Sequence, residues 1–517
     1  MYLDNKESFQ KRYFSKFISN LFSAVIGIVI ISIVTRTLGP SDYGNFNFLT
    51  TFFIALIGFF TLSTSMGFFT KLSKRQEEVK LIRFYLGLLG LLPVAVTIFI
   101  LVVFLLNQEH RFWPNQQTVF ILLAALFAFL NIVFQTIRQI NDALGYTVNS
   151  EKYIILQKIF GIIIIVILFI TNKLNLHTFF FYHFVILGFI LLLWFLHLNN
   201  KGTKPFARKN VLIWSEINKY FREFYLYSHP LFIYSLIALI VNIGGRWLLQ
   251  TFAGSEQQGF FSLGYSVSAL IFLFSGSLTP LFTREFSIAH NNNDFDRMRF
   301  LFKKLIPMFY CIVAALGVFV AFNGAQIGIL LGGSEFQQAG FVISIMSLYP
   351  IHQTYGQLNG SVFYATDQTK LYRNIGIVIK LFGLLLTFYF IGPNSHGGLA
   401  LGASGIAVSM LIIQFIGVNI QLLYITKFLS ISYLKFFLHQ CVAIGAFSLL
   451  GYLCKWFLGQ FIQSNILFLI GNTMIYFLLL CVFVFAFPMI VSMTRTELVN
   501  KIKLIIKVNA LNKLGLK

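Results

Sequence analysis

Long apolar runs alternate with short polar segments along the whole chain. Many of the runs approach the roughly 20 residues that a helix needs to cross the hydrocarbon core of a bilayer. They are longer and more continuous than the alternating segments of about ten residues that form outer-membrane strands. The pattern predicts an all-α membrane protein with about 14 transmembrane helices, at residues 17–37, 46–68, 84–106, 117–138, 154–172, 178–198, 226–250, 259–282, 305–323, 340–364, 374–391, 401–424, 437–455 and 465–489.

A polar pattern in the predicted fourth and fifth spans returns in the tenth and eleventh. The first copy reads Gln135-Thr136-x-x-Gln139-x-Asn141 and then Lys158-x-Phe160-Gly161. The second reads Gln353-Thr354-x-x-Gln357-x-Asn359 and then Lys380-x-Phe382-Gly383. The offset is 218 residues between Gln135 and Gln353 and 222 between Lys158 and Lys380. Self-similarity at a nearly fixed offset indicates an internal duplication.

The duplication predicts two pseudo-symmetric lobes of six helices and two extra C-terminal helices. Residues 38–42 and 252–256, which follow the first and seventh spans, also correspond, at an offset of 214. We predict an N-terminal lobe over 1–200, a cytoplasmic linker over 201–225, a C-terminal lobe over 226–425, and two additional transmembrane helices with a basic cytoplasmic tail over 426–517. Because each lobe has an even number of spans, both run in the same direction, and a path lies between them.

Composition and charge agree with a membrane protein. Of the residues, 57% are hydrophobic and 11% are charged, and the net charge is +22. The basic residues are spread over short loops and form no basic domain, which argues against nucleic-acid binding. With the predicted spans, 34 of the 39 Lys and Arg residues fall on the side of the termini. The positive-inside rule therefore places both termini in the cytoplasm. No small-residue cleavage site follows the first apolar run, so we expect an uncleaved first span and not a signal peptide.

Neither a metal, a cofactor nor enzymatic activity is expected. The four cysteines, Cys311, Cys441, Cys454 and Cys481, lie in or beside apolar runs and form no CxxC pair. This pattern indicates neither a disulfide framework nor a zinc site. The longest predicted extracytoplasmic loop, around Asn323 to Ala339, is too short to hold a catalytic domain.

Polar side chains inside the predicted spans are the first candidates for a binding site. Such groups are costly in hydrocarbon and usually face a cavity or another helix. In the fourth span they share one helical face. In the tenth they follow Tyr349-Pro350, where the proline is expected to interrupt the helix. They either line a path and hydrogen-bond a sugar or phosphate, or join neighbouring helices. The candidates are Gln135, Arg138, Gln139, His352, Gln353, Gln357 and Asn359.

Four further cations are candidates by their position. Lys158 and Lys380 either attract an anionic substrate from a cavity wall or extend to the lipid headgroups. Arg36 and Arg246, near the outer ends of the first and seventh spans, either contact an anion or anchor a helix end.

The carboxylates favour an anionic cargo. All 17 Asp and Glu residues fall in predicted loops or at span ends. Exporters of cationic drugs that are driven by protons or sodium usually need a buried carboxylate. Export of an anion against an inside-negative potential is favourable by about 2.3 kcal/mol per charge per 100 mV, so the potential alone can drive it. His183 and His352 are secondary candidates for proton coupling.

Residues 36–46 carry a family resemblance. Arg36-Thr37-Leu38-Gly39-Pro40-Ser41-Asp42-Tyr43-Gly44-Asn45-Phe46 resembles the Arg-x-Leu-Gly-Pro-x-x-Tyr-Gly-x-Phe signature of the polysaccharide-biosynthesis flippases. These are the Wzx-like O-antigen and capsule exporters of the multidrug/oligosaccharidyl-lipid/polysaccharide superfamily, which also contains the MATE exporters. Gly332-Gly333-Ser334-Glu335-Phe336 is similar to the family's loop after the ninth span. The predicted topology matches the family over nearly the whole chain.

The resemblance implies a V-shaped bundle that works by alternating access, with a cationic cavity to which Lys158, Lys380, Arg246 and Arg138 would contribute. It implies a monomer that flips an undecaprenyl-pyrophosphate-linked oligosaccharide from the cytoplasmic to the periplasmic leaflet of the bacterial inner membrane. Expected partners are the anionic lipid-linked oligosaccharide, membrane lipids and glycan polymerase machinery. The alternatives are a MATE-like drug or cation antiporter and, with less support, a membrane polysaccharide polymerase or ligase.

Overall fold

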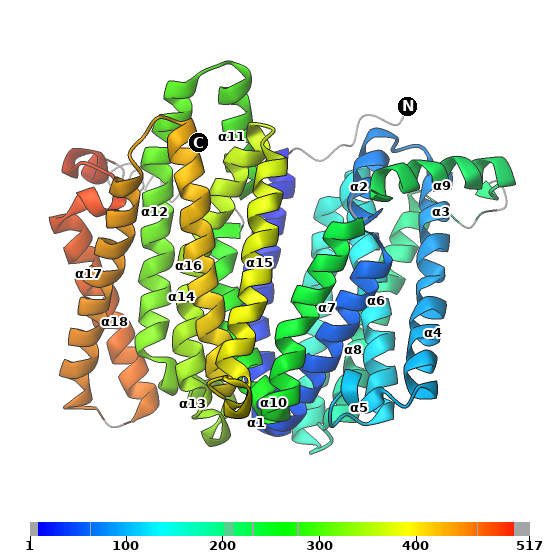
Figure 1. The fold of residues 1–517 in the computed structure, drawn as a ribbon, viewed down its shortest axis with the longest axis horizontal. Helices are drawn as coiled ribbons and strands as arrows, with labels where there is room; N and C mark the ends of the chain where they lie inside the picture. Colours follow the sequence, from blue (N-terminus) through cyan, green and yellow to red (C-terminus); the bar gives the residue numbers. More distant parts are fainter. Residues whose placement is uncertain are drawn as a thin grey trace, which may run out of the picture. The chain divides into compact units, whose positions relative to one another are not determined.

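The computed structural model describes residues 9–500 except 63, 202, 204, 206, 208, 209, 230, 231, 277, 278 and 463. Every regular element of this part is a helix, which confirms the all-α class (Figure 1). Lys6 and the basic residues from Lys501 onward, which entered the charge count, lie outside it. The helices are α1 (Phe9–Phe60), α2 (Thr64–Lys74), α3 (Val79–Gly90), α4 (Leu92–Leu105), α5 (Glu109–Phe112), α6 (Thr118–Leu144), α7 (Thr147–Ile170), α8 (Leu176–Asn200), α9 (Trp214–Ser228), α10 (Phe232–Gly276), α11 (Thr279–Asn291), α12 (Phe295–Phe322), α13 (Gly324–Gly332), α14 (Ala339–Ala365), α15 (Thr369–Ile391), α16 (Gly402–Phe428), α17 (Tyr433–Gly459) and α18 (Asn465–Ala486), with short 3₁₀ turns at Ser334–Phe336, Asn394–His396 and Pro488–Val491.

Eleven stretches of the described residues are helical, long and apolar enough to cross a bilayer. Two of them, Phe14–Phe60 and Ser235–Leu273, have 47 and 39 residues and greatly exceed the length that one crossing needs. Helix α14 has 27 residues but is not among the eleven, and its sequence from His352 to Asn359 is polar. The chain is a multi-span membrane protein, and the number of about 14 spans stays a prediction.

Two glycines explain the unusual length of α1 and α10. Gly39 has φ 69° and ψ 174°, and Gly254 has φ 81° and ψ −176°, a region that side chains disfavour. A 2.7 Å hydrogen bond from Arg246 to Ser262 shows that the chain reverses direction near Gly254. These two residues stand eight positions before and after the glycine, and in a straight helix they would be about 24 Å apart.

The described helices form two compact units. The first unit contains Met1–Ser262, Leu331–Phe336 and Leu384–Ile406, and the second contains Leu263–Leu330, Gln337–Gly383 and Ala407–Lys517. In the first unit α1 packs on α6 and α7, and α8 packs on the same two helices. A 2.7 Å ion pair between Lys16 and Asp142 also joins α1 to α6.

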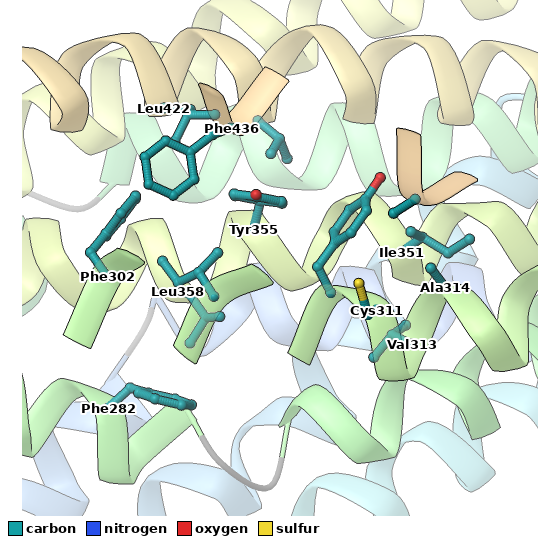
Figure 2. Packing of buried hydrophobic residues seen from close by; sticks show 14 of the residues in the cluster. Phe282, Phe302, Cys311, Val313, Ala314, Ile351, Tyr355, Leu358, Leu422 and Phe436 are labelled. Atoms are coloured by element: carbon teal, nitrogen blue, oxygen red, sulfur yellow. The ribbon is translucent and has the colours of Figure 1, made fainter. Parts of the chain in front are cut away.

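Helix α14 is central to the second unit, where it packs against α11 and α12. Figure 2 shows part of the buried cluster, in which Cys311 of α12 and Tyr355 of α14 lie among apolar side chains that include Leu422 of α16 and Phe436 of α17. Most side chains of α14 are buried. Its polar side chains must therefore find partners on neighbouring helices or remain unpaired at a cost.

Candidate functional site

The first copy of the repeated pattern folds as a helix–turn–helix. Helix α6 ends at Gly145, whose φ of 85° is the left-handed conformation common at helix C-termini. The N–H of Tyr146 donates to the carbonyl of Asn141 at 2.8 Å, and α7 begins at the next residue. This turn brings Arg138 and Glu151 together, with 2.9 Å between Nη2 and Oε1.

Glu151 is a buried acid that the sequence analysis placed in the loop between two predicted spans. It lies in the second turn of α7, and its side chain is 1% exposed, against 29% for Arg138. Its second oxygen, Oε2, is buried and has no hydrogen-bond partner among the described residues. Because the pair balances its own charge, Arg138 offers an anion less attraction than an unpaired cation would.

Lys158 lies two turns further along α7 and differs from Arg138 in having no acidic partner. It is half-buried, and in the described part of the chain it forms no hydrogen bond or ion pair. The adjacent Gln157 donates to the Ile186 carbonyl of α8 at 3.2 Å. A Cβ at Gly161 would come within 2.9 Å of the Tyr182 hydroxyl, so α7 and α8 are in close contact here. Because its ammonium has no acidic partner in the described residues, Lys158 can attract an anion.

His183 of α8 lies in an aromatic environment in the same unit. Its ring stacks on Phe46 at a centroid distance of 5.0 Å and contacts Phe127 and Phe179 at 5.0 and 4.7 Å. Its Nε2 atom is buried with no hydrogen-bond partner in the described residues. Its role in proton coupling stays a prediction.

The polar residues of the second copy mainly join α14 to α16. The Gln414 amide of α16 donates to the Gln353 side chain, and Asn359 donates to the Val418 carbonyl at 3.3 Å. The ring of His352 meets Phe415 edge-on at 4.9 Å. These contacts are of the interhelical kind. The Gln357 and Asn359 side-chain oxygens remain buried without a partner among described residues.

The repeated Lys-x-Phe-Gly motif has a packing explanation for its glycine. As Gly161 faces Tyr182 of α8, Gly383 of α15 faces Ile413 of α16, where a Cβ would lie 3.3 Å from its methyl group. Each glycine therefore lets the following helix approach closely. Lys380 is half-buried, as Lys158 is. In the first copy Gln135 is exposed, and Gln139 is half-buried.

Arg246 joins the two arms of α10 through neutral groups. It donates to Gln258 at 3.2 Å and to Ser262 at 2.7 Å, and its guanidinium carbon lies 4.4 Å from the centre of the Phe261 ring. None of these three groups carries a charge that would cancel the arginine's. Arg36 is exposed, close to the turn at Gly39.

Beside each glycine turn, side chains donate hydrogen bonds to a segment of the other copy, a feature that the sequence analysis missed. Beside the first turn, Thr35 donates to the Leu331 carbonyl at 2.9 Å. Beside the second, Gln250 donates to the Pro114 carbonyl at 3.1 Å, and Trp247 donates to the Arg111 carbonyl at 2.7 Å. All of these residues belong to the first unit. The repeat of residues 38–42 at 252–256 was the signal that these segments are equivalent, but its offset of 214 is one residue short, because the turn glycines Gly39 and Gly254 stand 215 residues apart.

These features define a multi-span α-helical membrane protein whose described helices contain half-buried cations and no group of three or more His, Cys, Asp or Glu able to hold a metal. The sequence model of a family described as "Polysaccharide biosynthesis protein" matches residues 9–285, which is more than half of the chain. The chain belongs to this polysaccharide biosynthesis protein family. The resemblance carried by residues 36–46 is thereby confirmed at the level of the family.

Two relatives agree with this membership, and a solved structure shares the fold. The chain is 20% identical over 405 residues to the capsular polysaccharide biosynthesis protein CapF of Staphylococcus aureus, covering 76% of this chain and 94% of that protein. It is 23% identical over 429 residues to the probable low-salt glycan biosynthesis flippase Agl15 of Haloferax volcanii, covering 81% and 83%. Its fold is that of the lipid II flippase MurJ in its inward closed conformation, with a TM-score of 0.69 at 14% identity over 91% of this chain and 99% of that chain.

Proposed function

We propose that this protein is a flippase that moves an undecaprenyl-pyrophosphate-linked anionic oligosaccharide from the cytoplasmic to the periplasmic leaflet of the bacterial inner membrane. It works by alternating access and performs no covalent chemistry. Family membership, the relative named as a glycan flippase and the fold shared with a lipid II flippase support the proposal.

The observation that carries the anionic cargo is the environment of Lys158. Lys158 is half-buried on α7 and has no carboxylate partner among the described residues. A pyrophosphate group supplies the negative charge that such a site lacks. Arg246, which donates hydrogen bonds to the neutral Gln258 and Ser262 side chains, is a second cation that the proposal assigns to the binding site.

The proposal also covers the orientation of the chain in the membrane and its division into lobes. Both termini are cytoplasmic, six-helix lobes at 1–200 and 226–425 are joined by a linker at 201–225, and the last two helices help to admit the lipid tail. The protein acts as a monomer and delivers its cargo to glycan polymerase machinery. Export of the anionic cargo is favoured by the inside-negative potential, by about 2.3 kcal/mol per charge per 100 mV.

The proposal is tested in cells whose surface glycan depends on this protein. Lys158→Ala combined with Lys380→Ala should abolish glycan display at normal protein levels, while lipid-linked glycan accumulates. Lys152→Ala removes an exposed lysine of the same helix and is the matched control. Normal display by the double variant would exclude both lysines from the mechanism.

Glu151 is the observation that favours the second candidate, a cation antiporter, because buried carboxylates bind ions and cationic drugs in membranes. Glu151 already forms a 2.9 Å ion pair with Arg138, which counts against a role in binding a transported cation. An antiporter would lose drug resistance in a Glu151→Gln variant that is still stably folded. A flippase of the proposed type would confer no such resistance in either form.

A further inference from the structure

Helix α9 is an amphipathic helix outside the eleven candidate spans. Figure 1 shows it lying across the ends of α2 and α3 in the first unit. Its buried residues pack on α3, where the Phe84 ring lies 5.3 Å from Tyr220 and 5.8 Å from Phe224. Phe84 is in the second turn of the candidate span Val79–Leu105, so α9 packs on the first turns of this span.

Both acidic residues of α9 are directed into the first unit. Glu223 accepts hydrogen bonds from Lys71 at 3.0 Å and from Arg75 at 2.6 Å. Glu216 accepts one from Lys80 at 2.6 Å. Their negative charges are therefore compensated on the inward side of the helix.

The outward side of α9 carries aromatic rings and positive charge. Trp214, Phe221 and Tyr225 are 80%, 58% and 57% exposed. At 100° per residue these three lie within about 40° of one another, so they form one stripe. Arg222 is exposed beside the stripe, about 80° from its centre, and has no hydrogen bond or ion pair among the described residues. Lys219 is exposed on the flank of the helix, about 140° from the centre of the stripe, and lies 5.8 Å over the Tyr220 ring.

We propose that the exposed aromatic stripe of α9, formed by Trp214, Phe221 and Tyr225, together with the flanking cations Arg222 and Lys219, binds anionic phospholipids at the membrane surface. Tryptophan and tyrosine rings are favoured in the interfacial region of a bilayer. Basic side chains beside an apolar stripe are typical of helices that lie in that region and select anionic lipid. Each Lys or Arg near an anionic surface contributes about fivefold to binding. The proposal does not depend on the identity of the cargo.

The test uses the full-length protein in nanodiscs that contain phosphatidylcholine and phosphatidylglycerol in about a three-to-one ratio. In one preparation the phosphatidylglycerol has brominated acyl chains, and in the other an equal amount of phosphatidylcholine is brominated. Bromine quenches tryptophan at short range. The difference between the wild-type protein and Trp214→Tyr isolates the contribution of Trp214 among the five tryptophans.

We expect Trp214 to be quenched several-fold more strongly by brominated phosphatidylglycerol than by brominated phosphatidylcholine. Lys219→Gln combined with Arg222→Gln should bring the two quenching efficiencies to equality. Lys152→Gln combined with Lys427→Gln removes two other exposed lysines and should leave the difference unchanged. Equal quenching by both lipids in the wild-type protein would overturn the proposal. Absence of quenching by either lipid would do so too, and would assign this face to water or to a protein partner.

Discussion

Gly44 and Gly259 occupy equivalent positions in the two copies of the duplicated chain, and each lies directly against the backbone of the other copy. A Cβ at Gly44 would stand 1.8 Å from the carbonyl oxygen of Ser255, and one at Gly259 would stand 2.0 Å from that of Pro40. Gly44 and Gly259 are 215 residues apart, as are Pro40 and Ser255. The contact is therefore reciprocal, as a two-fold relation between the copies requires.

Alanine at either glycine should force the two turns apart. We expect Gly44→Ala and Gly259→Ala each to destabilise the protein by about 1–3 kcal/mol, the usual cost of overpacking, and by similar amounts. Thermal melting of the purified variants measures this. Gly58→Ala and Gly188→Ala are matched controls, because nothing lies within 4 Å of the added carbon. They should be neutral or stabilising by about 0.5–1 kcal/mol. Equal melting temperatures for Gly44→Ala and Gly58→Ala would contradict the contact.

The pair of Arg138 and Glu151 predicts an asymmetric response to mutation. Arg138→Ala leaves a carboxylate that is 1% exposed without its counter-ion, whereas Glu151→Ala leaves a guanidinium that is 29% exposed. We expect Arg138→Ala to cost about 3–5 kcal/mol, the range for an uncompensated buried charge, and Glu151→Ala to cost clearly less. The double variant Arg138→Gln with Glu151→Gln should recover part of the loss, and denaturation of the three variants beside the wild-type protein checks this. A larger loss for Glu151→Ala than for Arg138→Ala would show that the burial is assigned wrongly.

The anchoring of α9 predicts a dependence on pH. The hydrogen bond from Arg75 is the largest cause that lowers the pKa of Glu223 below its ordinary value of 4.5. A group with a lowered pKa stabilises the folded state above its unfolded pKa, and this stabilisation is lost as the pH falls through the folded value. The difference in melting temperature between the wild-type protein and Glu223→Gln should thus be largest at neutral pH and should shrink below about pH 4.5. A difference that stays constant across this range would rule out the ion pairs as the anchor.

The apolar pattern predicted the helices because hydropathy summed over about 20 residues is a strong signal. Helix α17, for example, spans Tyr433–Gly459 around the predicted 437–455. The interruption of the predicted span 84–106 was not expected. Helix α3 ends at Gly90 and α4 begins at Leu92, with Pro93 in its first turn. A proline has no N–H for the helix ladder, so it favours a new start at that point.

The candidate site was only partly visible in the sequence. The recurrence of Lys158 and Lys380 could be read directly, but the packing role of Gly161 and Gly383 depends on which helix comes next in space. The ion pair of Arg138 with Glu151 depends on the turn at Gly145, which hydropathy does not report. The available signal for this ion pair was a glycine, Gly145, with the oppositely charged Arg138 and Glu151 on either side of it.

The most direct test of an anionic cargo recognised by Lys158 is transbilayer movement in proteoliposomes. A fluorescent undecaprenyl-pyrophosphate-linked glycan is placed in one leaflet, and its appearance in the other is followed over time. We predict that Lys158→Gln slows this movement about tenfold, as the loss of roughly 1.4 kcal/mol of binding would, while Lys158→Arg and the control Lys152→Gln keep most of the rate. Movement at the wild-type rate in Lys158→Gln would contradict the account.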